Sequence, residues 1–205
     1  VLKMFFEPKN GHGLKHNPFN ALVVPRPIGW ISTRDLNGVD NLAPYSFFNA
    51  VAYVPPQVMF SSTGAKRDQD GTKDTTANIR KTGCFCVNIV GQAMLDAMNL
   101  SSATLPNDVD EFKFAGVGKI ACETISCSRV ADAPAALECT LIDIIKIKGE
   151  TNTVVLGEVT GIYMEDAFIS GGRFDITKFT PVGRLGYRDY ANITEPFELV
   201  RPDED

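Results

Sequence analysis

Short polar side chains gather in three segments of this chain, each beside apolar residues. The first is Ser32-Thr33, which follows Arg26-Pro27-Ile28-Gly29-Trp30-Ile31. The second is Asn41-Leu42-Ala43-Pro44-Tyr45-Ser46, and the third is Lys73-Asp74-Thr75-Thr76-Ala77-Asn78. Amides and hydroxyls next to aromatic surface suit a flat ring with polar edges, whereas a Lys before a helix suits a phosphate. The three segments predict a site for a ligand that has both parts.

Lys73 is the strongest sign of anion binding in the chain, because it stands directly before a predicted helix start. Backbone N–H groups of a first helical turn and the positive end of the helix dipole attract anions. Thr75 can add a hydroxyl bond. The alternative is a plain helix start with a solvated Lys, and this alternative is favoured when the segment is taken alone.

Two other patterns favour ordinary structural roles. Gly116-Val117-Gly118-Lys119-Ile120-Ala121 matches part of a dinucleotide pattern, but poor helix formers follow it, so we interpret it as a loop-to-strand turn. His12 and His16 are four apart, yet the nearby Gly and Pro residues disfavour a helix that would align them as metal ligands. With these two His alone, a Ser-His-Asp or Cys-His constellation is improbable. We therefore predict no metal site and no catalytic side chain.

A β-rich scaffold has to position the polar segments. Alternation and turn signals predict strands over 28–33, 58–62, 84–90, 137–148 and 153–164, with short helices over 76–82 and 93–100. Asp74 or Thr75 is the predicted cap of the first helix, and Gly83 fits the position after its end. Many strands without alternating strand–helix units indicate a small antiparallel barrel.

Composition narrows the class of protein. The chain has 205 residues, 44% of them hydrophobic, and no low-complexity linker, which predicts one domain over 1–205. A net charge of −5 with scattered bases argues against nucleic acid, and no apolar run approaches the ~20 residues of a membrane span. Five Cys without regular spacing favour reduced, mostly buried thiols and a cytoplasmic location.

Six segments in order resemble the flavin reductase-like family of FMN-binding split barrels, which includes flavoredoxin-type proteins. The resemblance covers about residues 18–165 and leaves 166–205 as a C-terminal extension. It implies a mainly β fold with flanking helices, namely a six-stranded antiparallel Greek-key split barrel, and a homodimer. The matching segments are Arg26-Pro27-Ile28-x-Trp30-Ile31-Ser32-Thr33, Asn41-x-Ala43-Pro44-Tyr45-Ser46-x-Phe48-Asn49, Pro55-Pro56, Lys73-Asp74-Thr75-x-x-Asn78, Phe85-x-Val87-Asn88 and Gly157-Glu158-Val159.

The resemblance also implies an FMN site. The residues expected near the ring or ribityl chain are Trp30, Ser32, Thr33, Asn41, Ala43, Pro44, Tyr45 and Ser46. Those expected near the phosphate are Ser61, Ser62, Lys73, Asp74, Thr75 and Asn78. For Trp30 the residue type alone favours core or rim packing over ring stacking by about two to one. Asp74 is expected to orient neighbouring groups, since a carboxylate does not bind a phosphate directly.

Two functions follow from the resemblance. The first is an NAD(P)H-dependent flavin oxidoreductase that passes electrons to free flavin, a monooxygenase partner or another acceptor. The second is an FMN-binding electron carrier without direct NAD(P)H oxidation. Asn152-Thr153-Val154 stands where many family members carry a His, a departure compatible with the carrier. A structural barrel without flavin is a third, improbable alternative. Arg184, Tyr187 and Tyr190 either close over the flavin from a partner subunit or form a surface tail.

Overall fold

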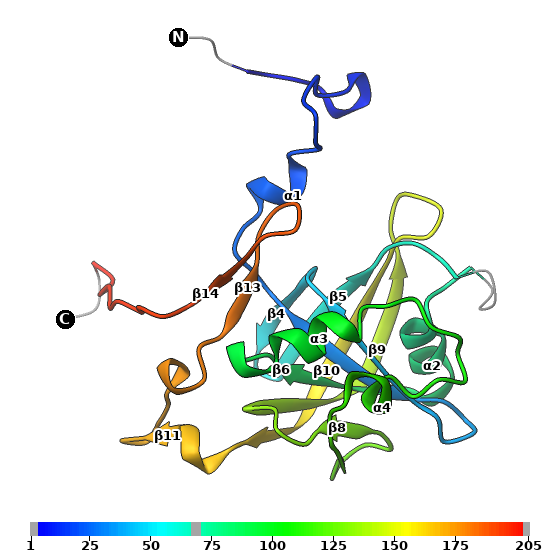
Figure 1. Ribbon diagram of the computed structural model, residues 1–205, viewed down its shortest axis with the longest axis vertical. Coiled ribbons are helices and arrows are strands. Elements are labelled where there is room, and N and C mark those ends of the chain that lie inside the picture. Colours follow the sequence, from blue (N-terminus) through cyan, green and yellow to red (C-terminus); the bar gives the residue numbers. More distant parts are fainter. Residues whose placement is uncertain (1–3, 67–70, 203–205) are drawn as a thin grey trace.

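A seven-stranded antiparallel sheet forms the body of the computed structural model, which describes residues 4–66 and 71–202 (Figure 1). Its strand order is β3-β2-β6-β9-β10-β5-β4, with antiparallel pairing throughout. The strands are β2 (Gly29–Arg34), β3 (Asp40–Tyr45), β4 (Phe48–Tyr53), β5 (Pro56–Ser62), β6 (Cys84–Ile89), β9 (Ala135–Lys146) and β10 (Thr153–Met164).

The expected mainly β fold with flanking helices is confirmed. The expected count of six barrel strands is not confirmed, because the sheet has seven strands, with β3 and β4 at the two ends of its order. Three smaller sheets accompany it. They comprise β1 (Arg26–Pro27) with β13 (Val182–Arg184) and β14 (Tyr190–Asn192), β7 (Lys119–Ala121) with β8 (Ser128–Val130), and β11 (Ile169–Ser170) with β12 (Arg173–Phe174).

The helices are short. They are α1 (Phe19–Leu22), α2 (Asp74–Thr82), α3 (Leu95–Leu100) and α4 (Glu111–Ala115), with 3-10 turns at Pro8–Asn10, Gln92–Met94, Asp166–Phe168 and Ile176–Lys178. In Figure 1 the N-terminal segment (blue) and the C-terminal segment (red) extend away from the large sheet. In the described parts of the chain no helix has the length and apolar character that crossing a membrane requires.

The β9–β10 hairpin is the longest feature of the sheet, as its two alternating runs predict. Each strand has twelve residues, and β10 has the predicted bounds. The register shifts at two places along the pair, which bends it. One shift lies at Gly157, where an added Cβ would stand 2.5 Å from the Phe85 ring. Glycine is therefore required where β10 crosses the core.

Two apolar clusters fix the elements that carry the polar segments. In the first, the Phe60 ring lies 4.7 Å from Tyr45 and 5.5 Å from Phe85, and Ile79 of α2 packs in the same cluster. In the second, Trp30 and Phe112 pack α3 and α4 against β2 and β3. Each such buried side chain contributes about 1.5–3 kcal/mol. These clusters hold the starts of α2 and α4 beside β3.

The two patterns set aside in the sequence have the structures predicted for them. Gly116 ends α4 with a φ of 69°, and the chain then enters β7, so this segment is a loop-to-strand turn. His12 and His16 lie in the N-terminal segment outside any helix. Among the described residues, no group of three or more His, Cys, Asp or Glu has an arrangement suited to a metal ion.

Candidate functional site

The polar segments meet around a cavity of about 240 Å³, which we call the smaller cavity. Strand β3, the start of α2, the loop 101–105 and the first residue of α4 form its walls. Half of the residues predicted for the site lie here, although they come from two distant stretches of sequence. The predicted residues that line it are Asn41, Ala43, Pro44, Tyr45, Lys73, Asp74 and Thr75.

The start of α2 forms one wall and differs from its prediction in one respect. The helix begins at Asp74, and Lys73 rather than Asp74 or Thr75 holds the N-cap position, with an extended backbone. Within the described chain no side chain caps this helix. Its first-turn N–H groups therefore lack the usual side-chain acceptor, which leaves them suited to a ligand oxygen. Gly83 ends the helix in the left-handed region, as predicted.

Two lysines bring positive charge to this wall. Lys73 Nζ lies 5.4 Å above the centre of the Tyr45 ring, and burial lowers the pKa of Lys73. Lys66 Nζ pairs with Asp74 Oδ2 and donates to the Leu105 carbonyl oxygen. Lys66 therefore neutralises one carboxylate oxygen beside the helix start and ties it to the loop 101–105.

Two buried polar atoms in the cavity wall lack a hydrogen-bond partner within residues 4–66 and 71–202. They are Asp74 Oδ1 and the Tyr45 hydroxyl. Both residues are less than a tenth exposed, and burial raises the pKa of Tyr45 to about 12, while the Thr75 and Ser62 side chains lie close enough to its hydroxyl that they act to lower this pKa. Buried polar groups are normally paired, and an unpaired one costs roughly 1–3 kcal/mol. Two such atoms in one cavity are what a site for a polar ligand provides.

Asn41 is held in one orientation by bonds on both sides of its amide. Its Oδ1 accepts from Thr75 Oγ1 at 2.7 Å, and its Nδ2 donates to Glu111 Oε1 at 2.9 Å. Behind it, Asn78 Nδ2 donates to Thr33 Oγ1 at 3.1 Å. Thr33 and Asn78 are thus joined to the site through hydrogen bonds but do not line the smaller cavity.

Glu111 is a cavity residue that the sequence analysis missed. Its Oε2 also accepts from the Leu42 N–H at 3.2 Å, so its carboxylate connects α4 with β3. Burial raises the pKa of Glu111 to about 7. The sequence did contain a signal for the start of α4, because Asp is a favoured N-cap residue. In the structure Asp110 accepts from the N–H groups of Phe112 and Lys113.

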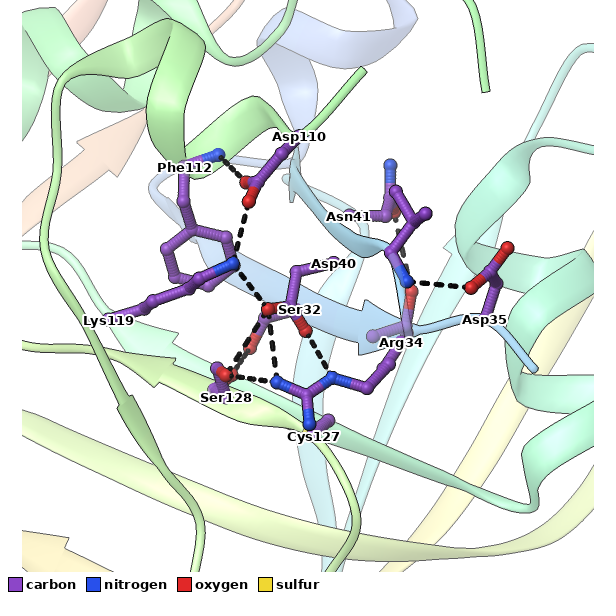
Figure 2. Close-up of polar contacts among 12 residues, drawn as sticks. Ser32, Arg34, Asp35, Asp40, Asn41, Asp110, Phe112, Lys119, Cys127 and Ser128 are labelled. Atoms are coloured by element: carbon purple, nitrogen blue, oxygen red, sulfur yellow. Dashed lines mark hydrogen bonds and ion pairs between the residues drawn. The ribbon is translucent and has the colours of Figure 1, made fainter. Parts of the chain in front are cut away.

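A charged network fixes α4 against β2 and β3 (Figure 2). Asp40 is 1% exposed and is bound by Arg34 Nε at 2.8 Å and by Lys119 Nζ at 2.6 Å. Lys119 also pairs with Asp110 at 2.6 Å, and Arg34 donates to Ser128 Oγ at 2.7 Å. Because Asp110 caps α4 and Glu111 follows it, this network sets where the Glu111 carboxylate lies.

A larger cavity of about 620 Å³ adjoins the smaller one, since Pro44 and Ser102 line both. The predicted residue Ser46 lines it, and so do Arg184, Arg188 and Tyr190 from the C-terminal extension. Arg184 is ordered by the Tyr190 hydroxyl and by the Tyr187 carbonyl oxygen. Within one chain, the extension therefore reaches the predicted site.

The remaining predicted residues lie in supporting positions. Trp30 is 0% exposed, packs in the core as its residue type favours, and donates from Nε1 to Ser101 Oγ at 2.8 Å. Ser32 is also 0% exposed and donates to the Ser128 carbonyl oxygen. Ser61 and Ser62 lie on β5 and line neither cavity. None of these four residues lines either cavity.

Lys66, Glu111 and the loop 101–105 are the cavity components that sequence reasoning missed. The loop has hydroxyls at Ser101, Ser102 and Thr104, but in the sequence it is an ordinary polar connection. The bond from Trp30 to Ser101 and the bond from Lys66 to the Leu105 oxygen connect it to the site.

Residues 21–175 match the family described as flavin reductase like domain. An uncharacterized protein of Deinococcus radiodurans is 37% identical over 91% of this chain and 84% of its own length. One from Aquifex aeolicus is 35% identical over 83% of this chain and 86% of its own.

Solved structures agree with these matches. Nitrilotriacetate monooxygenase component B from Bacillus cereus superposes with a TM-score of 0.87 at 29% identity, covering 97% of this chain and all of that one. Flavoredoxin of Desulfovibrio vulgaris (Miyazaki F) has a TM-score of 0.76 at 20% identity, over 88% of this chain and 93% of its own, and shares the fold.

Proposed function

The chain belongs to the flavin reductase like family, and on this premise we propose that it binds FMN across the smaller and larger cavities. The observation that carries the proposal is the pair of unpartnered buried atoms, the Tyr45 hydroxyl and Asp74 Oδ1, in the wall of one cavity. FMN has ribityl hydroxyls and ring N–H and carbonyl groups that match such atoms. Its phosphate matches the lysine-flanked helix start.

We assign roles to the wall residues on their chemistry. Lys73, Thr75 and the first-turn N–H groups of α2 hold the phosphate. Asp74 Oδ1 accepts from a hydroxyl, while its Oδ2 stays with Lys66. Ala43 and Pro44 offer apolar contact to the ring, and Ser46 extends this surface into the larger cavity.

Bound FMN would supply the redox chemistry, namely hydride and electron transfer with NADH or NADPH as the donor. The chain's residues bind and orient the cofactor, so no side chain has to act as general acid or base. The chain is then an NAD(P)H-dependent flavin oxidoreductase whose acceptor is free flavin or a partner protein. A monooxygenase partner is supported by the likeness to a protein named as a monooxygenase component.

An electron carrier without direct NAD(P)H oxidation is the second candidate. It is favoured by Asn152-Thr153-Val154 at the position where the family resemblance leads us to expect a His. Asn152 Nδ2 donates to the Lys148 carbonyl oxygen, so this side chain supports the exposed hairpin turn. With its amide engaged in the turn, Asn152 offers no evident hydrogen bond to a nicotinamide ring.

We also propose a homodimer and a cytoplasmic location. The outer surface of β4 supports the dimer, because Val51, Tyr53 and the following Val54 are 49%, 90% and 85% exposed. Exposed apolar surface of this kind is typical of association sites.

Light scattering coupled to size-exclusion chromatography would test the dimer. A Tyr53→Glu variant that stayed dimeric would exclude this surface as the dimer interface.

Visible absorption of the purified protein, before and after addition of FMN and desalting, tests the binding proposal. A retained two-band flavin spectrum is the expected result, and a colourless protein after desalting would contradict it. Stopped-flow mixing with NADH and NADPH then separates the two candidates. Rapid bleaching identifies the oxidoreductase, whereas a flavin that stays oxidised identifies the carrier.

A further inference from the structure

Four of the five cysteines converge on one side of the sheet, away from the two cavities described above. Cys84 and Cys86 alternate on β6 and share a face, as their spacing predicts, and Cys127 packs with them in a small apolar cluster. Cys122 packs against the same cluster and is its partly exposed thiol. Cys139 belongs to the main core instead. All five are free thiols in the structure.

Cys122 and Cys127 are placed for a disulfide. Cys122 directly follows β7, and Cys127 directly precedes β8, its antiparallel partner. Because the register sets Ala121 opposite Ser128, Cys122 falls opposite Cys127. The Cys122 N–H donates to the Cys127 carbonyl oxygen at 2.9 Å, and the two Sγ atoms are 3.9 Å apart. Hydrogen-bonded opposite residues have Cα atoms about 5.5 Å apart, inside the range of about 4.4–6.8 Å that a disulfide spans.

The turn between the two cysteines is held by one carboxylate. Glu138 accepts from the N–H groups of Glu123 and Thr124, at 2.9 and 2.6 Å, and from the Thr124 hydroxyl at 2.7 Å. These bonds hold the backbone of the turn, so the two thiols can meet by rotation of the cysteine side chains. Cys122 is itself partly exposed, so a small oxidant can approach its thiol from solvent, and its chain neighbours Ala121 and Glu123 line a cavity of about 320 Å³.

The surroundings favour Cys122 as the attacking thiolate. Hydrogen bonding from the Cys127 thiol, and next from Cys86, lowers the pKa of Cys122 and outweighs burial and the Glu138 carboxylate, which raise it, while the Arg129 guanidinium also lowers it. The pKa of Cys127 is raised, because its thiol proton is engaged by Cys122 and Cys84. Cys122 is thus the more easily deprotonated thiol of the pair, and Cys127 keeps its proton.

We propose that Cys122 and Cys127 form a dithiol that hydrogen peroxide converts to a reversible disulfide, independently of flavin. The Cys122 thiolate attacks one peroxide oxygen, the O–O bond breaks, and hydroxide leaves and takes a proton to become water. The Cys127 thiol then loses its proton and attacks the resulting sulfenic sulfur, so an S–S bond forms, the S–O bond breaks and a second water leaves. Two thiols lose two electrons, and one peroxide becomes two waters.

The test is thiol counting and peptide mapping on the full chain after exposure to one equivalent of peroxide. Wild type is expected to lose two of its five thiols in denaturant and to regain them with dithiothreitol. Mass spectrometry without reductant is expected to find a Cys122–Cys127 linked peptide. Cys127→Ser is expected to form no link and to accumulate a sulfenic acid at Cys122 that dimedone traps. Cys122→Ser is expected to keep its remaining thiols.

Cys139→Ser is the matched control and should lose two thiols as wild type does, because Cys139 lies outside the cluster. A link between Cys84 and Cys127, no thiol loss in wild type, or direct oxidation of Cys122 to sulfinic acid would each overturn the proposal. Circular dichroism of each variant confirms that it is folded before the thiols are counted, and apoprotein and FMN-treated protein should behave alike.

Discussion

Asn41 and Glu111 are 70 residues apart in the chain, yet the Asn41 amide donates a 2.9 Å hydrogen bond to the Glu111 carboxylate in the wall of the smaller cavity. Thr75 from α2 donates to the other end of the same amide. Three elements that are distant in sequence therefore share one polar side chain. The site is built around this amide, and the consequences can be measured.

Lys73→Ala should weaken FMN binding by roughly 10- to 100-fold, because a charge-assisted hydrogen bond contributes about 1.5–3 kcal/mol. Titration of apoprotein followed by flavin fluorescence measures the dissociation constant. Lys81→Ala is the matched control, since Lys81 is exposed in the last turn of the same helix. Equal affinities for wild type and Lys73→Ala would remove Lys73 from the site.

Tyr45→Phe should separate binding from stability. Its hydroxyl is unpartnered in the described structure, so its removal should leave the free energy of unfolding of the apoprotein unchanged or raise it by about 1 kcal/mol. The affinity for FMN should fall by roughly fivefold or more, for the loss of one hydrogen bond.

Tyr163→Phe is the control for Tyr45→Phe, and it should lose stability without losing FMN affinity. The Tyr163 hydroxyl donates to Glu165 at 2.8 Å, far from the two site cavities, so its loss should cost about 1 kcal/mol of stability and leave FMN affinity alone. Urea unfolding and FMN titration of both variants complete the comparison. A large stability loss in Tyr45→Phe would mean that its hydroxyl is paired within the protein.

Glu111→Gln should flatten the pH dependence of stability. Burial raises the pKa of Glu111 to about 7, above its value in the unfolded chain, so the native state holds this proton more tightly. Stability from this source is present below the unfolded pKa and is lost as pH rises towards 7. Wild type should therefore lose stability between pH 5 and 7.5, and Glu111→Gln should lose less.

Urea unfolding at these two pH values provides the comparison, with Glu150→Gln in the exposed β9–β10 turn as control. The quantity compared between the three proteins is the change in the free energy of unfolding with pH. The contributions of titrating groups that all three share cancel in this comparison. Parallel pH curves for wild type and Glu111→Gln would show that Glu111 titrates in its ordinary range.

Asp40→Asn should destabilise the protein by about 3 kcal/mol, because Arg34 and Lys119 would lose their shared buried partner. Burial alone would raise the pKa of Asp40, but the hydrogen bonds from Arg34 and Lys119 outweigh it and hold this pKa below its ordinary value. The resulting stability exists above the unfolded pKa and disappears as pH falls through the folded one.

Thermal and urea unfolding at pH 7 and pH 3 test this prediction. The difference between wild type and Asp40→Asn should be large at pH 7 and should shrink at pH 3. Asp108→Asn, in an exposed loop, should match wild type at both. A constant difference at the two pH values would assign the effect of Asp40→Asn to packing rather than to charge.

Local sequence signals predicted much of the sheet, and half of the proposed site residues line the smaller cavity. The β10 bounds follow from alternation, which acts over a few positions, whereas the site residues at β3 were named from the family resemblance. Lys73 was named for the phosphate end because its place before a helix is a local property, and it lines the smaller cavity, while its role in binding stays a prediction.

The missed residues depend on contacts between distant parts of the chain. Glu111 reaches the cavity because the Arg34–Asp40–Lys119–Asp110 network and the packing of Phe112 position α4, and no local pattern encodes these contacts. Ser32 lies in the expected strand but is fully buried, because the sequence did not reveal which side chains of that strand reach a cavity, whereas for Trp30 the residue type already favoured the core.

The small sheet of β1, β13 and β14 sets an order of assembly. The Arg26 guanidinium donates to the Leu185 carbonyl oxygen across 159 positions, and bringing such distant segments together is slow because loop closure costs entropy. The smaller cavity is lined by residues between 41 and 111, whereas the larger one needs Arg184, Arg188 and Tyr190. The smaller cavity can therefore form once the large sheet is in place, whereas the larger cavity is completed only when the C-terminal extension docks.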